Sequence, residues 1–481
     1  MTEDVPPTSA GGPDASEPRR ADAVRSRERI LAAAGRLLGQ SPGATVGDIA
    51  AAAGTSRTTV YRHFGDRDGV VAAVSERRRS PRPAAGAGHL PAGRLGRTGP
   101  VVLDAIHVMD AVPPAQLPGQ LVAEAARIAG VPVALYVLDI DGTYLLRVAG
   151  PRRLPDLLEA PLAVGPELDV EALQHLHAHL ETHPEPAHVV PLWLRGRAIG
   201  VMIAFGRPAQ PLDDMARQAA AAITLADRYT DVFAQAQRRK RPVAAAEIQQ
   251  SLLPPRISQV TGGEVAGNVL PSYEVAGDWF DIVENPDGLW ITIADGLGGT
   301  TRAAASSAVA LGALRASRRS GADVPEALIA MHQTLREMPG PHMEMTALGV
   351  HWNASTSVLR MVDCGHVPPV ILRAHGTVER VRFPGGRGLG GRAGPAPSQV
   401  VSSLGPGDRL VMVSDGIVRS GPDQVGLGMD AVVSAARRSR DRSASSTVRH
   451  IHAAVLRASP DGLDDDATAV CLAVAPEPAG A

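Results

Sequence analysis

The sequence predicts a multidomain chain in which an all-α block, an α+β block and a layered α/β block follow one another. Its length of 481 residues suits roughly three domains of about 150 residues each. A Pro- and Gly-rich stretch at 80–100 and a basic run that ends at Pro242 divide the hydrophobic patterns into three. The 48 basic and 50 acidic residues nearly cancel, so any role with nucleic acid or an anionic membrane must be local.

The ends of the chain and the cysteines bear on location. Residues 1–18 and 476–481 contain little to bury, so we expect two tails, the first of them disordered. No uninterrupted apolar run approaches the ~18 residues that a bilayer requires. Cys364 and Cys471 match no ligand or redox spacing, which favours two buried thiols in a reducing compartment. We therefore expect a cytoplasmic protein without membrane contact.

Residues 19–79 form a helical, Arg-rich block. Glycines at 43 and 54 separate its helices, which is the layout of a helix-turn-helix, and Ser56 can cap the helix after the turn. Between Arg19 and Arg82 there are 13 arginines and 6 acidic residues, a basic surplus typical of contacts with DNA phosphates. A helical bundle used only for packing or dimerisation is the alternative.

The core of this block, AxxAGTSRTTVYRHFGDRD, resembles the DNA-binding region of TetR-type regulators. The resemblance implies double-stranded DNA as a partner of residues 19–79. It places Arg67 at the DNA backbone and a further set of side chains at the major groove or its phosphates, namely Arg57, Thr58, Thr59, Tyr61 and Arg62. TetR-type proteins continue into an all-helical domain, whereas strand patterns follow here, so dimerisation must come from elsewhere.

Residues 101–208, the middle block, mix helix and strand patterns. LVAEAARIA is helical, VALYVLDI is a strand, and VVPLWL and AIGVMIAF form a hairpin about residues 195–197. The hairpin sequence resembles a GAF-type sensor domain, which implies either a small-ligand sensor or a dimerisation spacer. Four histidines at 175, 177, 179 and 183 favour an exposed helix face over a metal site.

Residues 209–242 carry a helical seam. Apolar residues recur there at alternating spacings of four and three, which predicts one signalling helix packed on a partner helix, and hence a homodimer. The seam consists of Met215, Ala219, Ala222, Ala226, Tyr229, Phe233 and Ala236. Pro242 should end this helix, and a second short helix, AAAEIQQSLL, should follow it.

Residues 243–475 alternate strands with helical stretches, a pattern typical of a layered α/β domain built on antiparallel strands. Asp278, Asp295, Asp415 and Asp465 each end a strand or open a turn beside glycine or another acid. Strand ends can direct carboxylates at one point, and a two-metal hydrolase needs such a cluster, because without cations the carboxylates would repel. A turn role is the alternative for any single Asp-Gly pair. The recurrence of the pattern at the edges of separate strands argues against it.

A succession of motifs carries a resemblance to the SpoIIE/RsbU-type branch of the metal-dependent protein phosphatases: AAEIQQSLLPP, EVAGDWFD, IADGLGG, TALGVHW, CGHVPPVIL, LVMVSDGI and DDDAT. The resemblance implies an αββα fold and two Mn²⁺ or Mg²⁺ ions. Asp278 would bridge the ions, Asp295 and the carbonyl of Gly296 would hold one, and Asp415 and Asp465 the other. The substrate would be a phosphoserine or phosphothreonine of a partner protein, commonly a STAS-type anti-sigma-factor antagonist.

Several residues keep two interpretations. Asp281 and Asp466 are either further ligands or turn-capping or solvated carboxylates, and His366 either orders its loop or acts as a general acid. Ala276 and Gly299 depart from the motifs of the family. The alternative function is therefore a DNA-binding transcriptional regulator whose phosphatase-like module binds without turnover. A phosphatase whose helix-turn-helix contacts protein is a further alternative.

Overall fold

The computed structural model describes residues 112–477 apart from 161, 182–185, 240–242, 273–276, 299–300, 341–342, 422–425 and 461. Among the first 111 residues it describes 30, 33–34, 37, 44–56, 59–60, 64 and 70. The chain divides into two compact units, Met1–Gly96 and Arg97–Ala481. None of the helices in the described ranges has the length and apolar character needed to cross a bilayer.

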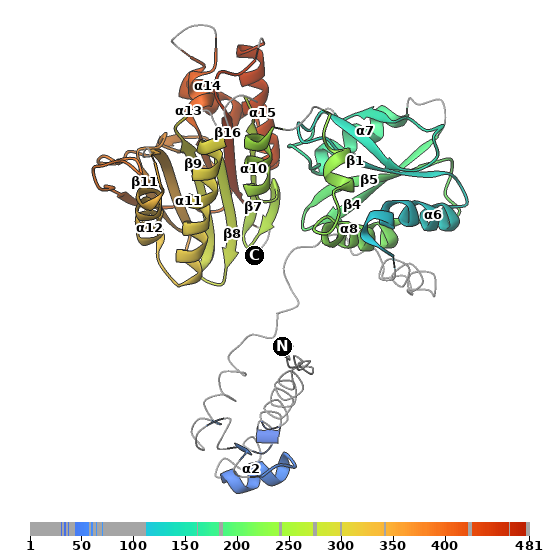
Figure 1. The fold of residues 1–481 in the computed structure, drawn as a ribbon, viewed down its shortest axis with the longest axis horizontal. Helices are drawn as coiled ribbons and strands as arrows, with labels where there is room; N and C mark the ends of the chain where they lie inside the picture. Colours follow the sequence, from blue (N-terminus) through green and yellow to red (C-terminus); the bar gives the residue numbers. More distant parts are fainter. Residues whose placement is uncertain are drawn as a thin grey trace, which may run out of the picture. The chain divides into compact units, whose positions relative to one another are not determined.

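In the first unit, helix α2 (Val46–Ala52) leads into a tight turn (Figure 1). Thr45 and Asp48 form a capping box at its start, and Gly54 has a φ of +62°, a conformation that glycine adopts without strain. The next helix is capped as predicted, since the amide of Thr59 donates to Oγ of Ser56 at 3.2 Å. Among the described residues of this unit, one hydrophobic cluster contains Ile30, Ala34, Val46, Ile49, Ala50, Val60 and Val70.

The second unit begins with a middle domain built on a five-stranded antiparallel sheet of order β3-β2-β1-β5-β4. Its strands are β1 (Val133–Leu138), β2 (Tyr144–Ala149), β3 (Leu157–Glu159), β4 (Ala187–Leu194) and β5 (Arg197–Phe205). The 3₁₀ turn η1 (Pro114–Gln116) precedes helix α6 (Leu117–Ala129), which covers one face of the sheet together with α8 (Asp213–Ala226). Helix α7 (Val170–Glu181) covers the other face. The structure therefore confirms an α+β unit.

The predicted hairpin joins β4 to β5 through Arg195 and Gly196, both at positive φ. The histidine-rich segment forms α7, where His175, His177 and His179 are exposed as expected; His183 lies outside the described residues.

The prediction of one helix over 209–242 is wrong. The segment forms α8 and a separate short helix, α9 (Val232–Ala236), with a break between residues 226 and 232. Met215, Ala219, Ala226 and Phe233 are buried in the middle domain's own core, against the sheet and α6. A periodic apolar stripe fits a helix packed on its own sheet as well as a helix packed on a partner. Most of the predicted seam is consequently unavailable for a partner helix.

The last domain contains two antiparallel sheets, of orders β14-β11-β10-β9-β8 and β13-β12-β15-β16-β7-β6. The strands of the first are β8 (Trp279–Asn285), β9 (Gly288–Gly296), β10 (Met345–Asn353), β11 (Val358–Cys364) and β14 (Ser398–Ser403). Those of the second are β6 (Ile257–Val260), β7 (Gly263–Leu270), β12 (Val370–Leu372), β13 (Val378–Arg380), β15 (Arg409–Val413) and β16 (Ala467–Val474).

The helices of this domain are α10 (Ala244–Leu252), α11 (Thr301–Arg319), α12 (Val324–Glu337), α13 (Asp415–Arg419), α14 (Gly428–Arg438) and α15 (Ala444–Ala458). The segment AAAEIQQSLL is thus the helix that the sequence predicts, α10.

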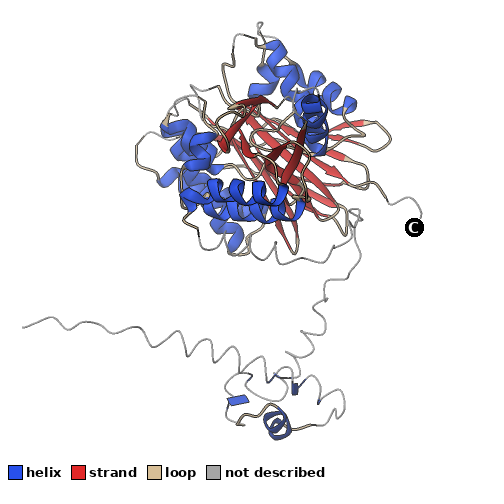
Figure 2. Cartoon of the chain, turned by 90° about the vertical axis from the view of Figure 1, so that its right-hand side faces the viewer, coloured by secondary structure: helices blue, strands red, loops and turns tan. Residues whose placement is uncertain are grey.

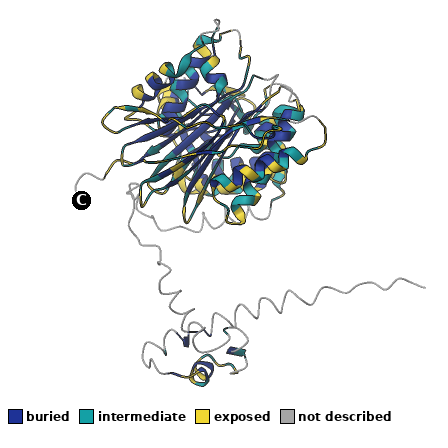
Figure 3. Ribbon diagram, turned by 90° about the vertical axis from the view of Figure 1, so that its left-hand side faces the viewer, coloured by how far each residue is buried: buried dark blue, intermediate teal, exposed yellow. Residues whose placement is uncertain are grey.

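Four layers result from the packing of these elements. Apolar side chains of both sheets fill the space between them, among them Phe280, Ile291 and Leu472. A second core joins β9, β10 and β11 to α11 and α12, and a third joins β7, β15 and β16 to α14 and α15. Figures 2 and 3 show the strands buried between helices whose outer faces are exposed. Strand ends of both sheets thereby approach one edge of the central core.

Candidate metal centre

The structure brings the four predicted aspartates together at that edge. Asp278 directly precedes β8 and Asp295 is the penultimate residue of β9, so both come from one sheet. Asp415 opens α13 directly after β15, and Asp465 precedes β16, so both come from the other sheet. Because the two sheets stack face to face, side chains at their ends converge on one place.

The carboxyl groups of these aspartates interact with one another. The carboxyls of Asp278, Asp415 and Asp465 all lie close enough to that of Asp295 to affect its pKa. Burial, reinforced by Asp415 and Asp465, raises the pKa of Asp295 to about 7. Burial, reinforced by Asp295 and Asp466, raises the pKa of Asp278 well above its ordinary value. Without cations the cluster therefore retains protons near neutral pH.

Asp466 is a fifth member of the cluster. It is 1% exposed, and its Oδ2 accepts hydrogen bonds from Nε2 of Gln249 at 2.6 Å and from the amide of Gly277 at 3.2 Å. Its Oδ1 accepts from the amide of Ser272 at 2.9 Å. Three donors thus fix this carboxylate beside Asp278. The sequence left open whether Asp466 is a further ligand or a turn-capping or solvated carboxylate, because the run LDDDAT does not tell which of its aspartates points inward.

Gly277 has a steric role beside Gly296, the residue expected to offer its carbonyl to an ion. A Cβ on Gly277 would lie 2.1 Å from the carbonyl oxygen of Gly296. The amide of Gly296 in turn donates to the carbonyl of Gly277 at 3.3 Å. Only glycine leaves the Gly296 carbonyl in place, so the second residue of the AGD motif is constrained by the site.

Asp281 and His366 have structural roles. Asp281 is 2% exposed and pairs with Arg315 and Arg318 of α11, at 2.8 Å each, and neither a metal ligand nor a solvated carboxylate is arranged in this way. The amide of His366 donates to Asp363, and its Nδ1 is hydrogen-bonded to Oγ1 of Thr346 at 2.8 Å. Burial lowers the pKa of His366 to about 4, so it is neutral and orders its loop.

The donor set fits a divalent ion. Mn²⁺ and Mg²⁺ prefer carboxylate and carbonyl oxygens, and the cluster offers these and no thiol or imidazole. Oδ1 of Asp415 is buried and accepts no hydrogen bond from the described residues, so it has an open coordination position. Among the described residues, no group of three or more His, Cys, Asp or Glu side chains is already arranged to hold a metal ion. The ions would have to displace protons and draw the carboxylates together.

Five of the six residues expected to contact DNA lie outside the described part of the chain. Only Thr59 lies among the described residues; it is partly buried, and its hydroxyl is hydrogen-bonded to that of Ser56. The others lie outside them, as do Ala276 and Gly299: Arg57, Thr58, Tyr61, Arg62 and Arg67.

Two regions of the chain match known protein families. Residues 285–475 match the family model of stage II sporulation protein E (SpoIIE). The last domain is therefore similar to the SpoIIE family over these residues. Residues 30–74 match the model of bacterial regulatory proteins of the tetR family, so the predicted TetR-type region is confirmed as well. The SpoIIE-type match includes Asp295, Asp415 and Asp465, whereas Asp278 precedes it.

Similar proteins include phosphoserine phosphatase RsbU of Bacillus subtilis, 22% identical over 228 residues, which make up 47% of this chain and 68% of RsbU. The structure of the RsbU and RsbW domains of Rv1364c from Mycobacterium tuberculosis is 23% identical, with a TM-score of 0.40. That match covers 47% of this chain and 64% of the other. The SiaA-PP2C domain of Pseudomonas aeruginosa is 18% identical with a TM-score of 0.42, over 48% of this chain and 94% of the other.

The raised pKa values predict how the stability of the ion-free chain depends on pH. Folding raises the pKa of Asp295 from 3.8 to about 7, so between these values the folded state binds more protons than the unfolded state. The midpoint of thermal unfolding should therefore fall as the pH rises through this range. Saturating Mn²⁺ at pH 8 should raise it by roughly 5–10 °C. Asp295→Asn should weaken both effects, whereas Asp441→Asn, at an exposed site, should change neither. A chain indifferent to pH and Mn²⁺ would contradict this.

The ion pairs of Asp281 predict a loss of stability without loss of metal binding. Asp281→Asn would leave two guanidinium groups without a counter-charge, one of them on the 6% exposed Arg318 side chain, and should destabilise the domain by about 2–4 kcal/mol. Calorimetric titration should find the same number of bound Mn²⁺ ions as in the original chain. Fewer ions in the folded variant would instead make Asp281 a ligand.

Proposed function

We propose that the chain is a metal-dependent protein serine/threonine phosphatase whose ions are held by Asp278, Asp295, Gly296, Asp415 and Asp465. The observation that carries the proposal is the convergence of four aspartates, from two sheets, on one buried cluster that retains protons in the absence of cations. Burying so many carboxylates is unfavourable unless opposite charge compensates them, and two divalent ions would do so. RsbU, to which this part of the chain is similar, is a phosphoserine phosphatase, in keeping with this chemistry.

When bound, two ions would orient a water, lower its pKa and neutralise the phosphoryl oxygens. The residues of the chain position the carboxylates for this task. Oγ1 of Thr468 donates to Oδ2 of Asp278 at 2.5 Å, and Gln249 and the amide of Gly277 fix Asp466 beside it. Such outer hydrogen bonds set the direction in which a ligand presents its oxygens.

The partner, the regulation and the assembly complete the proposal. The phosphoryl donor would be a phosphoserine or phosphothreonine of a regulatory protein, of STAS type as the sequence resemblance implies. The middle domain would act as a GAF-like sensor, and the TetR-type region would bind double-stranded DNA. A homodimer remains part of this proposal but needs a surface other than the buried seam of α8.

Phosphatase activity tests the leading function. Full-length protein with Mn²⁺ should release phosphate from a phosphorylated STAS-domain protein, and chelation of the ion should stop the release. Asp415→Asn should lower the rate by more than about a hundredfold, beyond the loss typical of a residue that only supports a ligand. Asp430→Asn, which alters a 93% exposed side chain, is the matched control and should keep the rate. Equal rates in the two variants would remove Asp415 from the ion site.

The alternative function is a DNA-binding regulator whose phosphatase-like module has lost turnover. The match of residues 30–74 to tetR-family regulators and the basic surplus around it favour a DNA-binding role in either case. Binding of two Mn²⁺ ions followed by phosphate release would exclude the alternative, whereas an inert module need not bind two ions.

DNA binding predicts a strong dependence on salt. The full-length protein should retard a duplex at 50 mM salt and release it at 200 mM, because phosphate contacts displace counterions. Arg57→Ala combined with Arg62→Ala should weaken binding by about tenfold or more and flatten the salt dependence. Arg380→Ala, at an exposed position of the last domain, serves as the control. Absence of retardation at 50 mM salt would favour contact with protein instead, and retardation that both arginine changes leave intact would place DNA binding elsewhere in the chain.

A further inference from the structure

Residues 167–171 of the middle domain contact the last domain through three acids, of which Glu167 and Asp169 are buried and Glu171 is partly exposed. Glu167 is 7% exposed, and its Oε1 pairs with Nε of Arg197, on β5, at 2.9 Å. Its Oε2 accepts the amide of Ile257 at 2.8 Å, and the charge of the neighbouring Arg256 guanidinium stabilises the ionised carboxylate. A single middle-domain carboxylate thus holds the segment that follows α10.

From Arg256 the contacts lead directly to α10. Its guanidinium donates to Oε1 of Gln250 at 2.9 Å and to the carbonyl of Pro254 at 2.7 Å. Gln249, the neighbour of Gln250, is 2% exposed and donates to Oδ2 of Asp466 and to the carbonyl of Asp278, at 2.6 and 2.9 Å. Only this short polar series separates Glu167 from the carboxylate cluster.

The packing around α10 shows why the polar contacts from Glu167 matter for its position. On one side α10 packs against α11, but on the side of the middle domain a cavity of about 350 Å³ separates it from β5 and α8. Glu167, Arg197, Arg256 and Gln250 all line that cavity. Polar contacts, and not close apolar packing, therefore fix the distance between α10 and the middle domain on this side.

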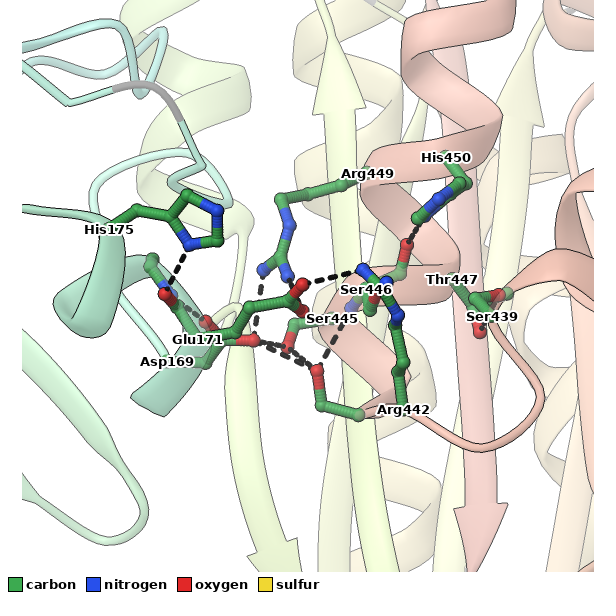
Figure 4. A network of polar contacts seen from close by, with 12 residues as sticks. Asp169, Glu171, His175, Ser439, Arg442, Ser445, Ser446, Thr447, Arg449 and His450 are labelled. Atoms are coloured by element: carbon green, nitrogen blue, oxygen red, sulfur yellow. Dashed lines mark hydrogen bonds and ion pairs between the residues drawn. The ribbon is translucent and has the colours of Figure 1, made fainter. Parts of the chain in front are cut away.

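A second contact from the same segment reaches α15 (Figure 4). Asp169 accepts hydrogen bonds from Ser443 and Arg449, both at 2.9 Å, and from Ser445. Glu171 pairs with Arg449 at 2.6 Å and with Arg442 at 2.7 Å. Among the described residues, none of the side chains in this second contact forms a hydrogen bond with α10. The two contacts can therefore be perturbed separately.

We infer that Glu167 is a positioning residue for the carboxylate cluster: through Arg256 and Gln250 it holds α10 so that Gln249 orients Asp466 beside Asp278. The Asp169 and Glu171 contacts on α15 dock the same segment but do not set α10. The middle domain would then influence the ion site by moving one carboxylate, with Arg197 linking that carboxylate to the sheet.

The test compares two identical changes placed four residues apart, Glu167→Gln and Glu171→Gln. Amide hydrogen exchange of residues 244–252 should become about tenfold faster in Glu167→Gln, because the amide of Ile257 and the Arg256 guanidinium lose the carboxylate that holds the segment after α10. It should stay within twofold of the original chain in Glu171→Gln, whose faster exchange should be confined to the start of α15. Mn²⁺ affinity, measured by calorimetry, should fall several-fold in Glu167→Gln and not in Glu171→Gln.

Gln250→Ala provides a second variant that leaves the buried Glu167 untouched and keeps a good helix former. It should also speed exchange in α10, and in combination with Glu167→Gln the effect should not exceed that of either change alone, as expected for one series of contacts. Unchanged exchange in α10 in both single variants would overturn the inference, as would equal acceleration by Glu171→Gln. The inference rests on the proposed function only for its consequence on catalysis. If exchange responds while no phosphatase activity is found, the proposed function fails and the positioning role stands.

Discussion

The mutual repulsion of buried carboxylates is the constraint on which the site depends. Asp278, Asp295 and Asp466 are each 6% exposed or less, and they lie beside Asp415 and Asp465. Such a cluster persists only if protons or cations compensate it. The two stacked sheets provide the rigidity that holds the strand ends in place, and the surrounding donors, Thr468 and Gln249 among them, take part of the charge. Fold and chemistry are linked through this one requirement.

Much of the last domain follows from sequence patterns. Asp-Gly and Ala-Gly-Asp beside predicted strands indicated three of the convergent aspartates, and the acidic run LDDDAT indicated Asp465. The end of a buried strand is where a carboxylate can face an enclosed site. Asp281 and Asp466 could not be separated in this way. Both follow a motif aspartate closely, yet one turns to Arg315 and Arg318 and the other to Gln249. Only the tertiary contacts decide between these roles.

The middle of the chain shows why a periodic pattern can mislead. Met215, Ala219 and Phe233 recur as a helical seam should, but the sheet of the same domain buries them. Periodicity tells which face of a helix is buried and not what buries it. The contacts of Glu167 and Asp169 could not be predicted from the sequence either, since their partners lie some 90 and 280 residues further along the chain. The same contacts join the middle domain to the last one.

Proton release on ion binding tests the central claim most directly. Calorimetric titration of the full chain with Mn²⁺ at pH 6.5, in two buffers of different ionisation enthalpy, measures how many protons leave as the ions bind. The account predicts two bound ions and a net release of about one proton or more, which should become smaller above pH 7 as Asp295 ionises beforehand. Absence of binding, or binding with no proton released at pH 6.5, would contradict a cluster of carboxylates that exchanges protons for metal ions.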